Sequence, residues 1–449
     1  MKKITIFLLI VMLVLGMATA CSETSDNEAT PSPDAESPSA PPEAEPDEPI
    51  TLVAPKIGLN DDQLAVEEAA EGGLSEGALY YIAVMDTIAE EYPNYEMEYV
   101  DWGWAETLDQ KQRALITSGD VPDIVAGETF IPTYAMEGIL EPLPQDIVDM
   151  VNPSFMVYDA DGVPVAVAQK SAVFMLFYNK DLMAQAGLDP ETPPTTWDEW
   201  QEMSDAITAA GNGDFYGGGI PSFPHAGGAL RATPFFRQMG TDFAVDGQPN
   251  LTDPKLQETL QYIREMNANF PAGLANQADE GPLWTAFEKD HTIGFVVNGT
   301  WEANGAEVNG VNWGVAPLPM PEGGVTGNCL VGSVYNAVPK AAKNKEASFN
   351  VIRAVLKYEN QLLQLDDNVC SPLNAIIEDT SLYEDNPTLM TAFESVRNGE
   401  FAGLATFAKN DGQAWEIINN KVLARTTITD DDIATICEDA QAEIEPLLE

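Results

Sequence analysis

Strand-like and helix-like hydrophobic patterns alternate along the chain from residue 50, and this alternation limits the possible folds more than any other feature. The apolar run ITLV is typical of a buried strand, and apolar residues then recur every three or four positions through 79–92, as on one helical face. The segment YEMEY at 95–99 alternates apolar and acidic residues, the period of a half-buried strand. A second amphipathic segment near 105–117 leads to the apolar DIVAG. This order predicts an α/β fold in which crossover helices connect a parallel sheet.

The same alternation returns in the middle of the chain. Thr196 and Glu199 in TTWDEW have capping-box spacing, so we expect a helix to begin at Trp197. Trp197 and Trp200 fall on the apolar face of that helix, which predicts that both belong to the core. From residue 343 onward nearly every pattern is helical. A chain of 449 residues exceeds one ordinary hydrophobic core and is expected to contain two domains.

The N-terminus has the order of an export signal. The basic start MKK is followed by an apolar run, and the small residues ATA then precede Cys21. We interpret 1–20 as a signal peptide and Cys21 as the lipid-carrying cysteine of a bacterial lipoprotein. An ordinary A-x-A cleavage site that happens to precede a cysteine is the alternative. Under either interpretation the protein is exported.

The segment after this signal is expected to be a tether. Residues 21–49 are rich in Pro, Ser, Ala and Glu and contain no Lys or Arg. Such a composition buries too little apolar surface to offset the entropy of ordering, so we expect disorder. Prolines and mutually repelling charges keep a segment of this kind extended. Attached to a lipid on Cys21, it would anchor the folded body to the outer side of the cell membrane.

The charge of the chain excludes some partners. The sequence holds 72 acidic and 21 basic residues, a formal net charge of −51. Binding to nucleic acid relies on Lys and Arg that neutralise phosphates, so a nucleic-acid partner is not expected. Direct adsorption to an anionic membrane surface is disfavoured for the same reason. We interpret the acidic excess as a solvated surface, which carries no information about the fold.

Cysteine and histidine usage argues against a metal site or cofactor. If Cys21 carries a lipid, Cys329, Cys370 and Cys437 remain, which allow at most one disulfide of undetermined pairing. There is no C-x-x-C motif and only two histidines, so zinc-ribbon, dithiol and histidine-rich metal sites are not supported. The acidic DADG at 159–162 is better interpreted as a hairpin turn than as a calcium site. We therefore expect no cofactor.

Seven stretches in order resemble one known family. They are ITSGDVPDIVAGE, EGILEPL, DGVPVAV, LFYNKDLMAQAGLDPETPPTTWDEW, FEKDHTIGFVVNGTW, WGVAPLPMPEGG and VPKAAKNKEASFNVI. Together they are similar to the family 1 extracellular solute-binding proteins of ABC importers, the maltose-binding type, over essentially all of 50–449. The block YNKD with its trailing TWDE is the most specific piece, followed by Gly-x-Trp at 299–301. The segment 57–77 departs from the family pattern.

The resemblance implies a periplasmic-binding-protein-like fold, with two α/β lobes and a ligand cleft between them. By position, the chain would cross between the lobes near 168–175 and 331–337. The N-terminal lobe would combine 50–170 with 300–334. The C-terminal lobe would combine 171–299 with 335–449.

The resemblance also implies which residues hold the ligand. Sugars stack on aromatic rings, which supply rigid contact area, while carboxylates and amides form hydrogen bonds with their hydroxyl groups. The expected ligand-binding residues are Trp301, Glu128, Trp104, Trp102, Trp415, Tyr335 and His225. Trp301 is the main stacking candidate. In the alternative interpretation one of Trp102 and Trp104 only packs in the core, and Tyr335 is a hinge residue. No residue is expected to be catalytic.

The implied function is capture of a sugar or oligosaccharide by hinge closure and its delivery to an ABC permease, by a monomer. The sequence has no G-x-x-x-x-G-K-[ST] and no G-x-S-x-G, so neither ATPase nor nucleophile-elbow chemistry is expected. A secreted carbohydrate-acting enzyme is one rival, although 72 acids make any carboxylate pair uninformative. A peptide- or polyamine-binding protein, or a sensory lipoprotein on the same fold, is another.

Overall fold

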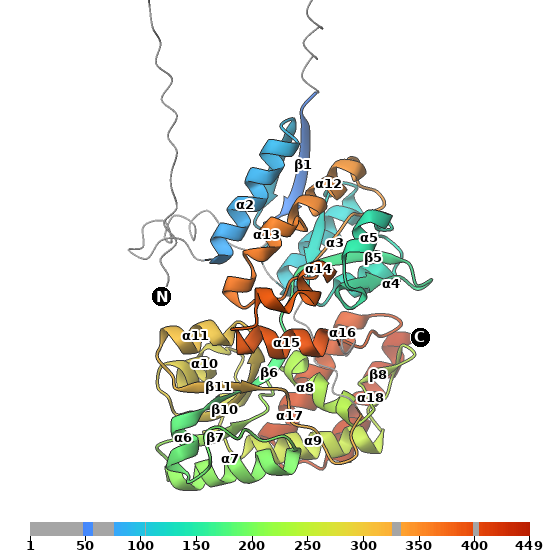
Figure 1. The fold of residues 1–449 in the computed structure, drawn as a ribbon. Helices are drawn as coiled ribbons and strands as arrows, with labels where there is room; N and C mark the ends of the chain where they lie inside the picture. Colours follow the sequence, from blue (N-terminus) through green and yellow to red (C-terminus); the bar gives the residue numbers. More distant parts are fainter. Residues whose placement is uncertain (1–47, 57–75, 104, 326–333, 398–403) are drawn as a thin grey trace, which may run out of the picture. The chain divides into compact units, whose positions relative to one another are not determined.

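The hydrophobic strands form two four-stranded sheets, a parallel pair and a short hairpin (Figure 1). The computed structural model describes residues 48–56, 76–103, 105–325, 334–397 and 404–449. The expected signal peptide, the tether with Cys21, the lone residue Trp104 and Cys329 lie outside the described residues. The two remaining cysteines, Cys370 and Cys437, are buried and free.

The elements fall into three stretches of the chain. The first contains β1 (Ile50–Pro55), α2 (Glu76–Glu91), β2 (Tyr95–Val100), α3 (Ala105–Ser118), β3 (Val125–Gly127), α4 (Ile131–Met136), α5 (Gln145–Met150), η1 (Pro153–Phe155), β4 (Met156–Tyr158) and β5 (Pro164–Lys170). The second contains β6 (Phe174–Asn179), α6 (Lys180–Gln185), α7 (Trp197–Gly211), β7 (Tyr216–Gly219), α8 (Ala226–Gln238), β8 (Ala244–Val245), β9 (Gln248–Pro249), α9 (Pro254–Asn267), η2 (Leu274–Asn276), α10 (Gly281–Glu288), β10 (Ile293–Gly299), α11 (Glu302–Val308) and β11 (Trp313–Ala316). The third contains β12 (Val334–Ala337), α12 (Lys345–Val355), α13 (Tyr358–Leu362), η3 (Leu365–Asp367), α14 (Asn374–Glu378), η4 (Thr380–Leu382), α15 (Pro387–Arg397), α16 (Asp411–Ile417), η5 (Ile418–Leu423), α17 (Ala424–Ile428) and α18 (Ile433–Leu448).

Most of the expected local structure is present. The helix expected at 79–92 is α2, and the strands that flank it, β1 and β2, pair in parallel. The capping box of α7 forms, since the Thr196 hydroxyl accepts from the Glu199 N–H and the Glu199 carboxylate accepts from the Thr196 N–H. Trp197 and Trp200 are buried, as predicted. The DADG segment is a turn between β4 and β5, closed by a bond from Asp159 N–H to the Val163 carbonyl.

The sheets themselves are mostly antiparallel, which differs from the expected parallel sheet. The first runs β3-β12-β5-β4 and every pair in it is antiparallel. The second runs β11-β6-β10-β7 and only β10 and β7 are parallel. The register shows this direction, since Val334 at the start of β12 lies opposite Lys170 at the end of β5. A strand that enters a sheet where its neighbour leaves must run in the opposite direction.

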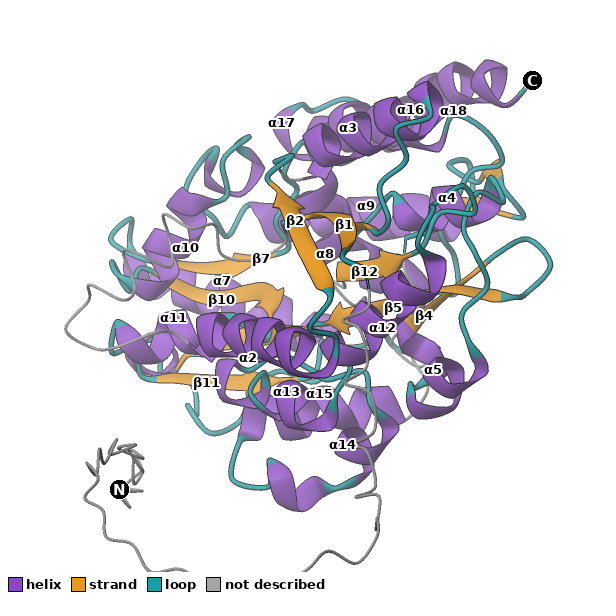
Figure 2. Ribbon diagram, turned by 90° about the horizontal axis from the view of Figure 1, so that it is seen from above, coloured by secondary structure: helices purple, strands orange, loops and turns teal. Residues whose placement is uncertain are grey.

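We call the elements around the sheet β3-β12-β5-β4 the first group and those around the sheet β11-β6-β10-β7 the second group. Two segments lie in the other group from the one expected. Residues 300–334 were assigned to the N-terminal lobe, yet β11 hydrogen-bonds to β6 in the second sheet. Residues 335–449 were assigned to the C-terminal lobe, yet β12 completes the first sheet, and α12 and α13 lie beside α2 (Figure 2). The apolar face of α12, with Ala347, Val351 and Ala354, shares a core with β1 and α2, which explains this placement.

The last helices return to the second group. α16, η5, α17 and α18 pack on one another and on α8 and α9, and their buried side chains belong to the core around β6. Chain passage between the two sheets therefore occurs more than once. The first passage, at residues 171–173 between β5 and β6, lies within the expected 168–175. The second lies between 316 and 334, and part of that segment is outside the described residues.

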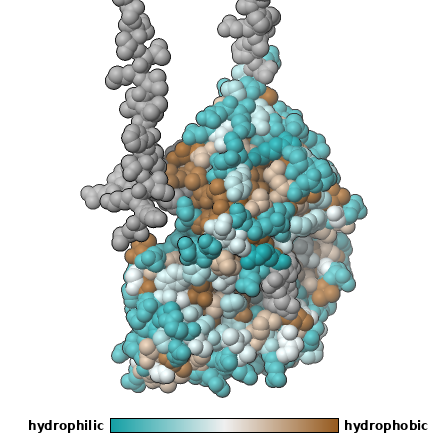
Figure 3. Space-filling model, viewed as in Figure 1, coloured by the Kyte–Doolittle hydropathy of each residue, from teal (hydrophilic) through white to brown (hydrophobic). Residues whose placement is uncertain are grey.

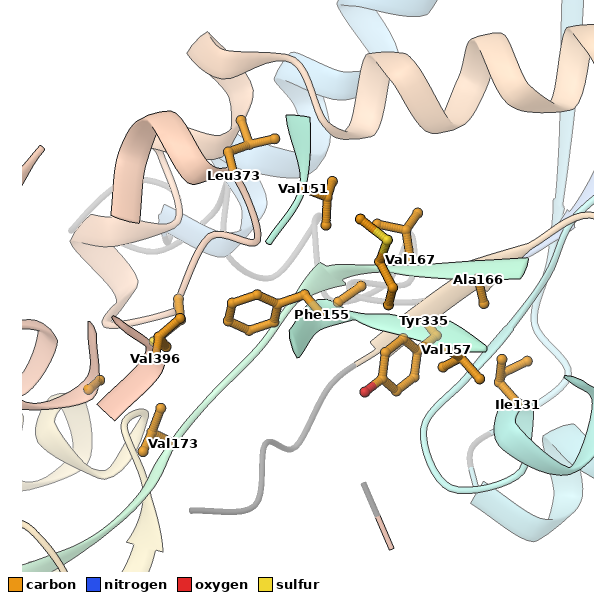
Figure 4. Close-up of a cluster of buried hydrophobic side chains, with 14 of the residues drawn as sticks. Ile131, Val151, Phe155, Val157, Ala166, Val167, Val173, Tyr335, Leu373 and Val396 are labelled. Atoms are coloured by element: carbon orange, nitrogen blue, oxygen red, sulfur yellow. The ribbon is translucent and has the colours of Figure 1, made fainter. Parts of the chain in front are cut away.

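One hydrophobic core includes strands of both sheets. It contains Val167 of β5 and Tyr335 of β12 from the first sheet, and Phe177 of β6 from the second. Val173 of the first passage and Val396 of α15 belong to the same core (Figure 4). Hydrophilic residues cover much of the face seen in Figure 3, with a hydrophobic area in its upper part. In the described part of the chain, no helix is both long and apolar enough to cross a membrane.

Asp123 is the side chain that attaches the returning segment to the first group. Its carboxylate accepts from the Val53 N–H of β1 at 2.9 Å and from the Asn344 side chain, just before α12, at 3.2 Å. We expect Asp123→Ala to lower the free energy of unfolding by about 1 kcal/mol, because it leaves two partly buried donors without their acceptor. Chemical denaturation measures this effect. Asp120→Ala, at an exposed position of the same loop, is the control and should change little.

Candidate functional site

Two strands of the first sheet, β3 and β5, end at the side of the sheet where a third, β12, begins. We call this side the edge of the sheet. β3 ends at Gly127 opposite Tyr335, and β5 ends at Lys170 opposite Val334. Glu128 directly follows β3. The carboxylate of Glu128 and the ammonium of Lys170 therefore leave the sheet at the edge where the chain passes to the second sheet.

The facing edge of the second sheet carries the aromatic candidate. Phe174, the first residue of β6, lies opposite Gly299, the last residue of β10. Trp301 follows two residues later and is the N-cap residue of α11. β7 ends beside β10, with Gly219 next to Val296, and the chain then runs to α8. The strand ends thus place Trp301 on the side of the second sheet at which the chain arrives from the first.

Trp301 has the geometry of a stacking surface. It is 40% exposed, and its ring meets the buried Phe174 ring edge-on, with 5.9 Å between centroids and planes at 81°. The ring covers Gly299 so closely that a Cβ there would lie 2.1 Å from it. One face of the indole is therefore held by Phe174 and Gly299 while the rest of the ring stays accessible.

Glu128 is half-buried and titrates abnormally. Burial raises its pKa to about 7, against the lowering effect of the charges on Lys170 and Arg231, while Glu280 adds to the rise. Burial lowers the pKa of Lys170, and the carboxylates of Glu128 and Asp367 oppose that shift. Glu128 and Lys170 leave the strand ends of the first sheet, and Arg231 and Glu280 belong to elements around the second, so charges from both parts act on one another. A carboxyl group with such a pKa can both accept and donate hydrogen bonds near neutral pH.

Arg231 of α8 lies at the centre of this site. It is 4% exposed, and its Nη2 lies 2.9 Å from Oε2 of Glu280 and donates to Oδ1 of Asn298, also at 2.9 Å. Its Nη1 donates to the Gly227 carbonyl at 2.9 Å. Its guanidinium lies 4.8 Å from the ring centre of Trp284. A buried charge needs this degree of pairing, because desolvation of an isolated cation is costly.

His225 stands at the entrance of α8. Its Nδ1 accepts from the Gly227 N–H at 3.1 Å, and its ring stacks on Phe223 with 5.5 Å between centroids. Burial lowers the pKa of His225 more than the nearby Glu280 raises it. The ring is therefore neutral at pH 7 with Nδ1 as acceptor, which leaves Nε2–H as a donor. The Nε2 atom has no hydrogen-bond partner within the described residues.

A second carboxyl group of this region belongs to Glu302, the residue that follows Trp301 in the chain. Glu302 is 1% exposed and its Oε2 accepts from the Asn298 side chain at 2.5 Å. Burial, followed by the neighbouring Glu288, raises the pKa of Glu302 to about 8. Asn298 thus connects Arg231 with Glu302. The polar network therefore extends from Arg231 through Asn298 to Glu302, the first residue of α11.

Of the other predicted site residues, two lie in a hydrophobic core, one is half-buried against it and one lies outside the described residues. Trp415 is 8% exposed, donates to the Ala405 carbonyl and packs in the core of the second group, so its ring is not available to a ligand. Tyr335 is 7% exposed and lies within the shared core, so we do not retain it in the site. Trp102 is half-buried against that core. Trp104 is outside the described residues.

The residues of this site that were not singled out from the sequence include Lys170, Phe174, Arg231, Glu280, Trp284, Asn298 and Glu302. Arg231 carried a usable signal, since it interrupts the apolar run GGALRATPFF. A charge on an otherwise buried helix requires a buried partner. The identity of that partner had no local signal, because Glu280 lies 49 residues further along the chain.

No group of three or more His, Cys, Asp or Glu side chains among the described residues is arranged to hold a metal ion.

Comparison with known proteins establishes the family. The model of the bacterial extracellular solute-binding proteins matches residues 72–362. The chain belongs to this family. Its members are exported binding proteins, so the chain is a binding protein and not an enzyme.

Individual relatives are distant. The maltotriose-binding protein of Pyrococcus abyssi is 24% identical over 248 residues, 53% of this chain and 51% of that protein. The sn-glycerol-3-phosphate-binding periplasmic protein of Salmonella typhimurium is 29% identical over 112 residues, 24% of this chain and 26% of that protein. The chain thus spans about half the length of its curated relatives or less. The crystal structure of the cyclic α-maltosyl-1,6-maltose binding protein from Arthrobacter globiformis has the same fold, with a TM-score of 0.70, 20% identity, and coverage of 89% of this chain and 99% of that one.

Gly299 controls the position of the Trp301 ring. We expect Gly299→Ala to displace that ring, because the new methyl group would occupy the space in which it lies. The change should appear in the tryptophan fluorescence and near-ultraviolet circular dichroism of the folded protein. Gly412→Ala is the matched control, since a Cβ there meets nothing within 4 Å. An unchanged Gly299→Ala spectrum would contradict this account of the ring.

The raised pKa of Glu302 predicts a pH-dependent stability. Folded Glu302 keeps its proton up to about pH 8, whereas the unfolded chain loses it near its ordinary value. The native state therefore binds more protons between these values, and stability falls as pH rises through that range. Glu302→Gln cannot ionise, so its melting temperature relative to wild type should rise between about pH 5 and about pH 8.5. Glu307→Gln, exposed on the same helix, should show no such trend.

Proposed function

We propose that this protein captures a sugar or oligosaccharide and delivers it to an ABC permease. The observation that carries the proposal is the partly exposed Trp301 ring, held edge-on by Phe174 next to buried polar groups. Sugars present apolar C–H faces that stack on such a ring, and hydroxyl groups that donate hydrogen bonds to carboxylates. The Pyrococcus protein is named for maltotriose and the Arthrobacter protein for cyclic α-maltosyl-1,6-maltose, which supports the same ligand class.

Capture would proceed by closure of two lobes, one around each sheet. Glu128 comes from the edge of the first sheet, and Trp301 and Glu280 come from the second group. A ligand that touches both sides favours the closed state by its differential contacts. The short passage at 171–173 would serve as one hinge. The closed form is the one that the permease would recognise.

The protein would act outside the cell as a tethered monomer. We propose that residues 1–20 are removed on export and that Cys21 then carries the lipid anchor. Residues 21–49 would form the acidic tether. The alternative ligands on the same fold are peptides and polyamines, and a sensory lipoprotein is the alternative role. The Salmonella relative, named for sn-glycerol-3-phosphate, adds a phosphorylated polyol to the ligands that need testing.

The proposal is tested by calorimetric titration of the folded body against maltose-type and other oligosaccharides, sn-glycerol-3-phosphate, peptides and polyamines. We expect binding to an oligosaccharide. Trp301→Ala should weaken that binding at least tenfold, or about 1.4 kcal/mol. Because Trp301 is 40% exposed, the melting temperature without ligand should change little.

Tyr358→Ala is the control for loss of an exposed aromatic ring, since Tyr358 is 38% exposed on α13. It should leave the affinity unchanged. Binding of a peptide or polyamine but no sugar would sink the carbohydrate proposal. Sugar binding that Trp301→Ala does not weaken would place the ligand elsewhere.

A further inference from the structure

A single guanidinium contacts both the polar and the aromatic parts of the candidate site. On the polar side, Arg231 pairs with Glu280, through 2.9 Å from Nη2 to Oε2 and 3.3 Å from Nη1 to Oε1. Both carboxylate oxygens are thus held by one planar group, which fixes the orientation of the carboxylate. The side chain of Glu280 keeps about a quarter of its surface exposed, at 25%. Its carboxylate is therefore positioned and still reachable.

The backbone around Arg231 is shaped for this contact. A Cβ on Gly227 would lie 2.0 Å from Oε1 of Glu280, so only glycine permits the carboxylate to approach. The Gly227 carbonyl accepts from Arg231 Nη1, and the Gly227 N–H bonds to His225. One turn of backbone thus orients the imidazole and the guanidinium together.

On the aromatic side, three rings surround the same guanidinium. Its carbon lies 4.8 Å from the ring centre of Trp284, 5.5 Å from that of Phe174 and 5.8 Å from that of Phe223. All three distances are within the range of a cation–π contact. Phe174 in turn holds Trp301 edge-on. The position of the stacking ring therefore depends on a ring that rests against Arg231.

We propose that Arg231 is a positioning residue for ligand binding. It holds the Glu280 carboxylate and the rings of Phe174 and Trp301 in a fixed arrangement relative to one another. This inference rests on the proposed function. Lysine cannot replace it, because an ammonium group lacks the planar fork that reaches Glu280, Asn298 and the Gly227 carbonyl at once. The role is to orient groups that the ligand touches, without direct ligand contact by Arg231.

The same helix supplies a matched control. Arg237 of α8 is also buried, 8% exposed, and pairs with Asp242 at 2.7 Å. Replacement of either arginine by lysine weakens a buried ion pair and should reduce stability. Only the replacement of Arg231 should alter the site.

The experiment compares Arg231→Lys with Arg237→Lys in the full exported protein. The first readout is oligosaccharide affinity, expected to fall at least tenfold in Arg231→Lys and less than twofold in Arg237→Lys. The second readout needs no ligand. It is the fluorescence of Trp301 and its quenching by acrylamide, isolated by subtracting the spectrum of Trp301→Phe in each background, and it should change only in Arg231→Lys.

The outcomes separate this proposal from the function on which it rests. If no sugar binds wild type but the Trp301 signal still changes only in Arg231→Lys, the sugar-binding proposal fails and the positioning role stands. Equal affinity and an unchanged Trp301 signal in Arg231→Lys would overturn the positioning role. Equal effects in both lysine variants would reduce Arg231 to a structural ion pair. If Arg231→Lys does not fold, Glu280→Gln tests the same contact and should give the same changes.

Discussion

The backbone between β5 and β6 is the constraint on which the rest of the structure depends. Only residues 171–173 separate the two strands, and Ser171 and Cys370 exchange both backbone hydrogen bonds beside them. Four steps from Lys170 to Phe174 span at most about 14 Å, at about 3.5 Å per residue. The edges of the two sheets must therefore face each other at close range. Glu128 follows a strand end at one of these edges and Trp301 follows a strand end at the other, so the facing edges carry both side chains.

The site formed at these edges concentrates charge of both signs in a chain that has little positive charge. Among 21 basic residues, Lys170 and Arg231 lie beside the carboxylates of Glu128 and Glu280. Within a low-dielectric site such pairs interact strongly and lose little to screening by salt. The acidic surplus elsewhere on the surface is solvated and contributes little to the shape of the fold. The two populations of acids therefore have different physical roles.

Sequence patterns predicted the local structure well, because helical faces and caps depend on residues that lie within a few positions of one another in the sequence. The α7 capping box, the buried Trp197 and the parallel β1–β2 pair were all accessible in this way. The grouping of β11 and β12 was not, since each pairs with a strand far away in sequence. Trp415 was misjudged for a related reason: an aromatic residue looks the same in sequence whether its ring faces a core or a cleft. Glu280 had no local signal at all.

The interleaved strand order also determines when each sheet can form. The second sheet is built from one continuous stretch, β6 to β11, and can assemble as soon as that stretch is available. The first sheet needs β12 between β3 and β5, and in that pairing Asn336 lies opposite Val167, 169 positions earlier in the chain. Pairings of this separation are slow because a long loop must close first. Of the strands in the first sheet, β4 and β5 can pair with each other early, whereas β3 has no partner until β12, near the later end of the chain, is available.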